Sequence, residues 1–167
     1  MKINKGVEWA AHACTLLAAL PDGWSLNAEA LADYHDLPPA YMAKQMQSLA
    51  RAGLVTSARG GGGGYRLAKP ADDISLLDVY LAIEDNQSAF RCMEIRQNGP
   101  CGARKEDCKT PCGIAARFYA AEQAFRVSLA DIPLTEIAIE AASRKSPARV
   151  KQVLAWVTAN AAQPNVD

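Results

Sequence analysis

The stretch that decides the fold is residues 38–70, PPAYMAKQMQSLARAGLVTSARGGGGGYRLAKP. After two prolines, apolar residues recur at helical spacing, and Pro39 suits the first turn of that helix. Gly53 suits its C-terminal cap. Two short runs of strand-forming residues, 54–58 and 65–67, then flank a run of five glycines, which predicts a hairpin. The stretch therefore predicts a helix followed by two short antiparallel strands.

Two further helices are predicted before this stretch. Apolar residues repeat at helical spacing through residues 3–20, and the run stops at the turn formed by residues 21–23. Asn27 is a good N-cap for a short helix that reaches about Tyr34. Helix, short helix, tight turn, helix and hairpin, in this order, describe a winged helix-turn-helix with a small two-stranded β-wing.

The rest of the chain is predicted to be helical apart from one loop. Ser75 and Asp78 form a capping-box pattern at the start of the next helix. The expected helices span about residues 75–84, 113–130, 135–142 and 147–161. The fold class is therefore mainly α, a winged helix-turn-helix with a long C-terminal dimerisation helix. The predicted division is a winged helix-turn-helix domain over 1–84, a cysteine-rich loop over 85–112, the dimerisation helix over 113–131 and a helical tail over 132–167.

The long helix is assigned to dimerisation because of its surface. Its large apolar stripe consists of Ile114, Phe118, Phe125 and Leu129. Its small residues, which let a second helix approach closely, are Ala115, Ala116, Ala120, Ala121 and Ala124. The alternative is that the helix only covers the core of its own domain. Little of the chain is left to cover a helix of this length, so dimerisation is the favoured interpretation.

The whole chain has 167 residues and a formal net charge of zero, and half of its residues are hydrophobic. This length supports one domain with an appended helical part. No segment approaches the apolar length of a membrane span, and the first residues lack the pattern of a signal peptide. A cytoplasmic protein without membrane association is therefore expected. In the cytoplasm thiols stay reduced, so the cysteines are predicted to be metal ligands or redox-active groups.

Residues 38–70 hold five basic residues and no acidic one. In a helix-turn-helix the second helix enters the major groove, and basic side chains at a wing tip contact the minor groove or phosphates. The predicted DNA-binding residues of the helix, all expected to be exposed, are Tyr41, Lys44, Gln45, Gln47, Ser48 and Arg51, and those beside the glycine run are Arg59 and Arg66. The alternative is a solvated helix in a protein–protein module. The glycine run lacks the Lys and Ser/Thr of a phosphate-binding loop.

The cysteines form the second functional signal. Four of the five fall within 21 residues in a loop rich in glycine and proline, namely Cys92, Cys101, Cys108 and Cys112. Thiolates gathered on a loop can converge on a metal. A zinc site ranks second, after another kind of metal centre, because zinc sites space their cysteines more closely in both pairs. A reversible disulfide needs no cofactor and ranks third. Cys14 is predicted to be a buried core thiol, and His35 an exposed turn residue or a phosphate contact.

Three stretches together carry a resemblance: KGVEWAAHACTLLA at residues 5–18, the whole of 38–70, and ISLLDVYLAIE at 74–84. The chain resembles, over about residues 1–130, the family of small dimeric winged-helix regulators that includes the iron–sulfur cluster assembly regulator and the nitric-oxide-sensing repressor. This resemblance implies a homodimer formed through the long helix, palindromic double-stranded operators, and in several members an iron–sulfur cluster in the cysteine loop.

Within that family the chain is similar to the redox-sensitive response regulator subgroup. Its markers are Glu8, Trp9 and His12, the segment CMEIRQ at residues 92–97, and the pair Cys108 and Cys112. The subgroup implies a [2Fe–2S] cluster between subunits, held by Cys92 and Cys112 from one side and by Glu8 and His12 from the other. Cys101 departs from the subgroup pattern, so Cys101 and Cys108 stay candidate ligands. Glu8 and His12 share one helix face, which an ordinary surface pair would also do.

These observations predict a redox-responsive transcriptional regulator, acting as a repressor, whose operator affinity depends on an iron–sulfur cluster at the dimer interface. A metal-free regulator that senses by thiol and disulfide chemistry is one alternative. An iron–sulfur assembly adaptor that binds no DNA is the other. An enzyme is not expected, because the sequence has no nucleophile–base pair outside the cysteine loop and no cofactor fingerprint.

Overall fold

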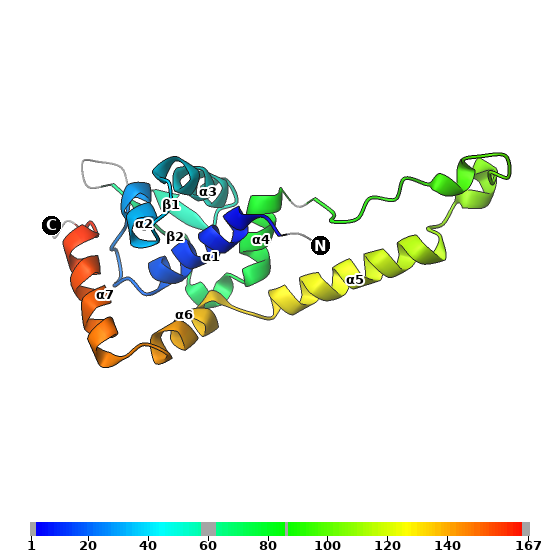
Figure 1. The fold of residues 1–167 in the computed structure, drawn as a ribbon. Coiled ribbons are helices and arrows are strands. Elements are labelled where there is room, and N and C mark those ends of the chain that lie inside the picture. Colours follow the sequence, from blue (N-terminus) through cyan, green and yellow to red (C-terminus); the bar gives the residue numbers. More distant parts are fainter. Residues whose placement is uncertain (1–2, 58–62, 86, 165–167) are drawn as a thin grey trace.

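The computed structural model describes residues 3–57, 63–85 and 87–164. The longer elements are α1 (Lys5–Ala18), α2 (Ala28–Tyr34), α3 (Pro39–Arg51), β1 (Val55–Ser57), β2 (Tyr65–Leu67), α4 (Leu76–Glu84), α5 (Gly113–Ala130), α6 (Leu134–Ser143) and α7 (Pro147–Asn160). The 3-10 helices are η1 (Ala71–Asp73), η2 (Ile95–Gln97) and η3 (Lys105–Cys108). A body holds most of these elements, and α5 projects from it as an arm. The cysteine loop runs from α4 along this arm to its far end, where η2 and η3 lie (Figure 1).

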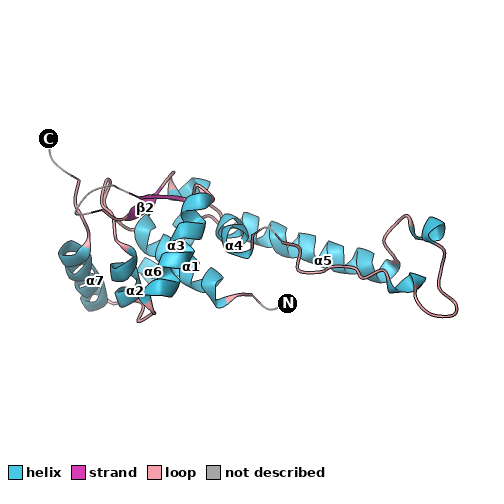
Figure 2. Cartoon of the chain, turned by 90° about the horizontal axis from the view of Figure 1, so that it is seen from above, coloured by secondary structure: helices cyan, strands magenta, loops and turns pink. Residues whose placement is uncertain are grey.

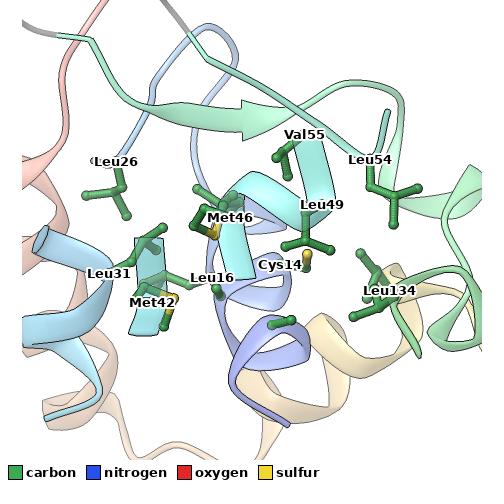
Figure 3. Packing of buried hydrophobic residues seen from close by; sticks show 14 of the residues in the cluster. Cys14, Leu16, Leu26, Leu31, Met42, Met46, Leu49, Leu54, Val55 and Leu134 are labelled. Atoms are coloured by element: carbon green, nitrogen blue, oxygen red, sulfur yellow. The ribbon is translucent and has the colours of Figure 1, made fainter. Parts of the chain in front are cut away.

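The body forms around α1 and α3, which cross with their apolar faces together. From α3 the fully buried side chains are Met42, Met46 and Leu49, spaced as one face of a helix. They meet Cys14 and Leu16 of α1, as Figure 3 shows. Replacing one large side chain of such a core by alanine lowers the stability of the folded protein by about 2–5 kcal/mol.

Local signals set the ends of the helix-turn-helix pair. The side chain of Asn27 accepts a hydrogen bond of 2.7 Å from the backbone N–H of Ala30, so α2 begins at the predicted cap. The chain then turns through Asp36, whose φ is +52°. Pro39 occupies the first turn of α3, as predicted.

The wing is a two-stranded antiparallel sheet, in which Val55 pairs with Leu67 and Ser57 with Tyr65. Tyr65 also forms a bridge with Leu26, through backbone hydrogen bonds of 2.7 and 3.1 Å. The hairpin is thereby fastened to the segment before α2. Gly64 allows this approach, because a Cβ there would lie 2.7 Å from the backbone carbon of Leu26. The predicted hairpin is confirmed over the described residues.

Helix α4 begins at Ser75 with the predicted capping box. The Asp78 N–H donates to the Ser75 hydroxyl at 3.1 Å, and the Ser75 N–H donates to the Asp78 carboxylate at 2.8 Å. Helix α5 packs against α4 near its own C-terminal end, where Tyr80 and Phe125 meet edge to face with ring centroids 5.3 Å apart. The rest of α5 leads away from the body (Figure 2).

The tail returns to the body after α5. Leu134 of α6 is fully buried in the core beside α1. Trp156 of α7 packs on Tyr34 of α2 with ring centroids 4.8 Å apart, and Ala162 forms a bridge with Ser25. Residues 132–164 therefore complete the core of the winged helix-turn-helix (Figure 1).

Candidate functional site

The first candidate surface is the outer face of α3 and the wing. Tyr41 is 58 % exposed, and Lys44, Gln47 and Arg51 are exposed on the same helix. Arg66 is exposed on β2, where it pairs with Thr56 across the hairpin. No acidic side chain lies in the first turn of α3. The positive end of the helix dipole is therefore not neutralised from within α3.

Two of the predicted DNA-binding residues do not face solvent, so the expectation of exposed side chains is wrong for Gln45 and Ser48. They are 8 % and 9 % exposed. Gln45 lies three residues after Met42 on the inward face of α3, against α1. A Cβ placed on Gly6 of α1 would lie 2.8 Å from the Gln45 side-chain oxygen. The Ser48 hydroxyl accepts a hydrogen bond of 2.9 Å from Arg51. Arg59, also predicted to bind DNA, lies outside the described residues.

The second candidate surface is on α1. Glu8 and His12 are both exposed and lie one turn apart. Beside them Trp9 packs edge to face on Tyr41 of α3, with ring centroids 6.0 Å apart. His35, at the C-terminal end of α2, lies 5.4 Å from His12 between ring centroids.

His35 was expected to be exposed, and this expectation is wrong. The residue is half-buried because Tyr34 packs edge to face on its ring, with centroids 4.9 Å apart. Its buried Nε2 has no hydrogen-bond partner among the described residues. Burial first, and then the charge of His12, lower the pKa of His35 below its usual value.

The third candidate surface is the cysteine loop. Cys92 and Cys112 line one apolar cavity of about 260 Å³. The Cys92 Sγ accepts a hydrogen bond from the Glu94 N–H, and the Cys112 Sγ accepts one from the Ala115 N–H, both at 3.4 Å. Cys112 is the N-cap of α5, where the helix dipole favours a negative charge. Both sulfur atoms therefore accept a hydrogen bond from a backbone N–H of the loop or of α5.

The other cysteines have different surroundings. Cys108 is half-buried in η3, and Cys101 is exposed. Cys14 is fully buried in the core, as predicted, and burial raises the pKa of its thiol to about 12. Cys14 is therefore protonated near neutral pH and shielded from solvent.

The four predicted cluster ligands form two separate halves within one chain. Cys92 and Cys112 line one cavity of the cysteine loop, whereas Glu8 and His12 are exposed on α1, which belongs to the body (Figure 1). Over the described ranges, one chain brings no three His, Cys, Asp or Glu side chains together as a metal site. The chemistry of each half suits an iron–sulfur cluster, since thiolates and imidazole both serve as its ligands. Within one chain, these four side chains therefore do not form a single site.

One contact in the loop was not predicted from the sequence. Arg96 binds Glu94 and the carbonyl of Thr110, and so joins the segment after Cys92 to the segment before Cys112. Opposite charges two residues apart in the CMEIRQ segment were visible in the sequence, but nothing in it indicated the bond to Thr110.

None of the described helices is long and apolar enough to cross a membrane.

The winged helix-turn-helix with its exposed, basic α3 defines a winged-helix DNA-binding protein. The Rrf2 family model, described as an iron-dependent transcriptional regulator, matches residues 3–140. The chain belongs to the Rrf2 family of helix-turn-helix transcriptional regulators, which confirms the family predicted from the sequence.

One relative is a protein of Lactococcus lactis named as a candidate HTH-type transcriptional regulator, YffB. It is 32% identical over 140 residues, which are 84% of this chain and 88% of that protein. The solved structure of T. potens IscR aligns with a TM-score of 0.65 at 18% identity, covering 90% of this chain and 96% of that one. CymR of B. subtilis, described as the global cysteine regulator, aligns with a TM-score of 0.64 at 20% identity, covering 84% and 98%. At these identities the two structures confirm the fold.

Proposed function

We propose that this regulator is a homodimeric, redox-responsive repressor whose affinity for a palindromic operator is controlled by a [2Fe–2S] cluster at the dimer interface. One observation carries the proposal. Cys92 and Cys112 share a cavity at the tip of the arm, while Glu8 and His12 are exposed on the body. Two subunits arranged about a two-fold axis would complete two equivalent sites.

In this proposal, the outer face of α3 and the wing bind the operator. Lys44, Arg51 and Arg66 are exposed cations that can neutralise phosphates. Gln47 and Tyr41 are exposed on the same helix and can reach base edges. Gln45 and Ser48 are assigned a different role, because they are buried. Gln45 packs against Gly6 of α1 and holds α3 in place, and Ser48 accepts a hydrogen bond from Arg51 of its own helix.

In this proposal, two subunits dimerise through the face of α5 that carries Ala116, Ala120 and Ala124. Phe118 stacks on Phe90 of the same chain with ring centroids 4.7 Å apart, and Phe125 packs on Tyr80. Ile114 and Phe118 nevertheless stay 71 % and 52 % exposed, so the N-terminal half of the large apolar stripe is open to a partner. The small residues Ala116, Ala120 and Ala124 are exposed. Side chains this small let two helices pack at close range, as in other helix pairs with small interfacial residues.

Bound between Cys92 and Cys112 of one subunit and Glu8 and His12 of its partner, a [2Fe–2S] cluster would supply a one-electron redox centre. The residues determine how it is tuned. A histidine in place of a thiolate raises the reduction potential of such a centre. The carboxylate of Glu8 is a hard oxygen ligand, which soft iron–sulfur sites hold less tightly than thiolate.

The contact between α1 and α3 offers the route from this site to the operator. Gly6 of α1 lies directly against Gln45 of α3, and Trp9 packs on Tyr41. A shift of α1 is therefore carried to α3. Two recognition helices must match half-sites about one turn of DNA apart, so a small rotation of each is enough to weaken binding.

A mixed dimer tests the scheme. One subunit carries Glu8→Ala and His12→Ala and keeps its cysteines, and the other carries Cys92→Ala and Cys112→Ala and keeps its α1 donors. After anaerobic reconstitution, we expect neither homodimer to show the visible absorption of a cluster. The mixed dimer has one complete intersubunit site and should hold one cluster. A colourless mixed dimer beside a coloured wild type would refute the intersubunit ligand set.

A second candidate function is thiol sensing without metal. It is favoured by the cavity that Cys92 and Cys112 both line, because it makes these two thiols the candidate pair for a reversible disulfide. In this case anaerobic protein supplied with iron and sulfide stays colourless. Operator affinity then follows the oxidation of the cysteine pair, measured by fluorescence anisotropy before and after reduction.

A further inference from the structure

The cysteine loop is closed by one side chain, Arg96. Its Nε donates to Glu94 Oε1 at 2.5 Å, and its Nη2 donates to Glu94 Oε2 at 2.9 Å. The same Nη2 donates to the carbonyl oxygen of Thr110 at 2.9 Å. Glu94 follows Cys92 by two residues, and Thr110 precedes Cys112 by two residues. One guanidinium group therefore ties together the two chain segments that carry the cysteines.

Glu94 takes a costly conformation to make this contact. Its φ is +49°, in the left-handed region that residues with a Cβ rarely adopt. The same conformation directs its N–H to the Cys92 Sγ at 3.4 Å. Backbone strain of this kind persists where the surroundings hold it in place. Here the bidentate ion pair with Arg96 holds it.

The backbone around Arg96 is also fixed. The carbonyl of Arg96 accepts a hydrogen bond of 2.8 Å from the N–H of Ala103. A Cβ on Gly102 would lie 2.5 Å from the carbonyl oxygen of Gln97, so η2 packs tightly against the next segment of the loop. Arg96 is thus anchored through its main chain and its side chain together.

The cation also lies close to the cysteines that follow. The pKa of Arg96 is raised above its usual value, first by the hydrogen bond to Glu94 and also by the charges of Cys108 and Cys112. This agrees with the hydrogen bond to Thr110, which places the guanidinium next to the segment that leads to Cys112.

We propose that Arg96 is a positioning residue that, with Glu94, closes the loop and brings Cys92 and Cys112 into one site before any ligand is bound. Its importance for regulation rests on the proposed function, since it requires that these two cysteines carry the signal. The closure itself is a property of the metal-free protein. A planar fork that binds Glu94 and Thr110 at once requires arginine, and lysine offers only a point charge.

The experiment measures how fast Cys92 and Cys112 pair in the metal-free dimer. The background carries Cys101→Ser and Cys108→Ser, and the oxidant is diamide, which takes up the two electrons and two protons that the thiols release. Non-reducing gels separate pairing within a subunit from pairing between subunits. We expect Arg96→Ala and Arg96→Lys to slow pairing within the subunit about tenfold, the factor that corresponds to the removal of one charge-assisted hydrogen bond. Glu94→Gln should slow it as well.

Arg104→Ala is the matched control. Arg104 is exposed in the same loop, pairs with Asp107 at 3.2 Å, and should leave the pairing rate unchanged. Thermal unfolding of the body should be unchanged in all variants, which separates positioning from general loss of structure. The proposal would be overturned if Arg96→Ala or Arg96→Lys formed the Cys92–Cys112 disulfide as fast as the wild-type protein does. It would also be overturned if the wild-type protein never formed this disulfide. A wild type that binds no cluster refutes the proposed function alone, since the pairing rates still decide the role of Arg96.

Discussion

Cys14 and the loop cysteines differ in reactivity for a reason visible at the scale of single residues. Burial raises the pKa of Cys14 to about 12, so almost none of it is thiolate near neutral pH. In the reduced, metal-free protein, we expect iodoacetamide to modify the four loop cysteines while Cys14 stays unmodified until the protein unfolds. Peptide mass spectrometry over a time course measures this. Modification of native Cys14 at the rate of Cys101, the exposed control, would contradict the buried placement.

Single residues also show what a sequence can and cannot predict. The caps at Asn27 and Ser75 were predicted correctly because each depends on atoms within three residues of itself. The exposure of Gln45 was predicted wrongly because it depends on Gly6, a residue far away in the sequence that leaves room for it. The bond from Arg96 to Thr110 was missed for the same reason. Local hydrogen bonds are encoded locally, whereas burial and long-range contacts depend on which elements meet.

At the scale of elements, the wing depends on Gly64. A Cβ there would lie 2.7–2.9 Å from the backbone of Leu26, and backbone cannot move aside as a flexible side chain can. We expect Gly64→Ala to break the bridge between Leu26 and Tyr65, to lower stability by about 1–3 kcal/mol and to weaken operator binding. Urea unfolding and fluorescence anisotropy measure the two effects. Gly53→Ala is the control. A Cβ at Gly53 would have no atom within 4 Å, so this substitution destabilises the protein only through the strain of an alanine at a φ of +71°.

The start of the cysteine loop is held to α5 by Glu122. The hydroxyl of Ser88 donates to Glu122 at 2.6 Å, and Arg126 pairs with it at 2.9 Å. The bond from Ser88 first, and then that from Arg126, lower the pKa of Glu122 below 4.5. A carboxyl group with a lowered pKa stabilises the fold above its unfolded pKa, and this stability is lost as the pH falls through the folded value.

This loss of stability on acidification should be visible at the start of the cysteine loop. Between about pH 6 and about pH 3, amide hydrogen exchange of residues 87–90 should lose protection in the wild type. In Glu122→Gln the protection should be low already at about pH 6 and should change little on acidification. Glu140→Gln is the control, because Glu140 pairs with Arg144 on the exposed surface of α6. Equal pH dependence in wild type and Glu122→Gln would show that another group holds the loop.

For the whole molecule, the proposed dimer depends on the exposed small residues of α5. Ala120 is exposed in the middle of the arm, among small residues. We expect Ala120→Glu to produce monomers, because a charged side chain prevents close helix packing and is costly to bury. Light scattering after size-exclusion chromatography measures the mass. Ala142→Glu makes the same change at an exposed position of α6 and should leave a dimer. A dimeric Ala120→Glu protein would place the interface elsewhere.

A dimer carries two copies of α3 to its operator, so the change made by one substitution counts twice. Lys44 is exposed and should bind phosphate, whereas Gln47 should bind bases. Removing one cation that binds a phosphate lowers the slope of log affinity against log salt by about 0.9, so Lys44→Ala should flatten the slope by about 1.8. Gln47→Ala should keep the wild-type slope and reduce discrimination between operator and altered half-sites. Anisotropy titrations over a range of salt concentrations measure both, with Lys151→Ala on α7 as the control for a distant charge.

A slope that Lys44→Ala leaves unchanged would move the phosphate-binding position away from α3. Because phosphate binding by Lys44 depends only on the exposed face of α3, this result holds whether the loop cysteines carry a cluster or a disulfide.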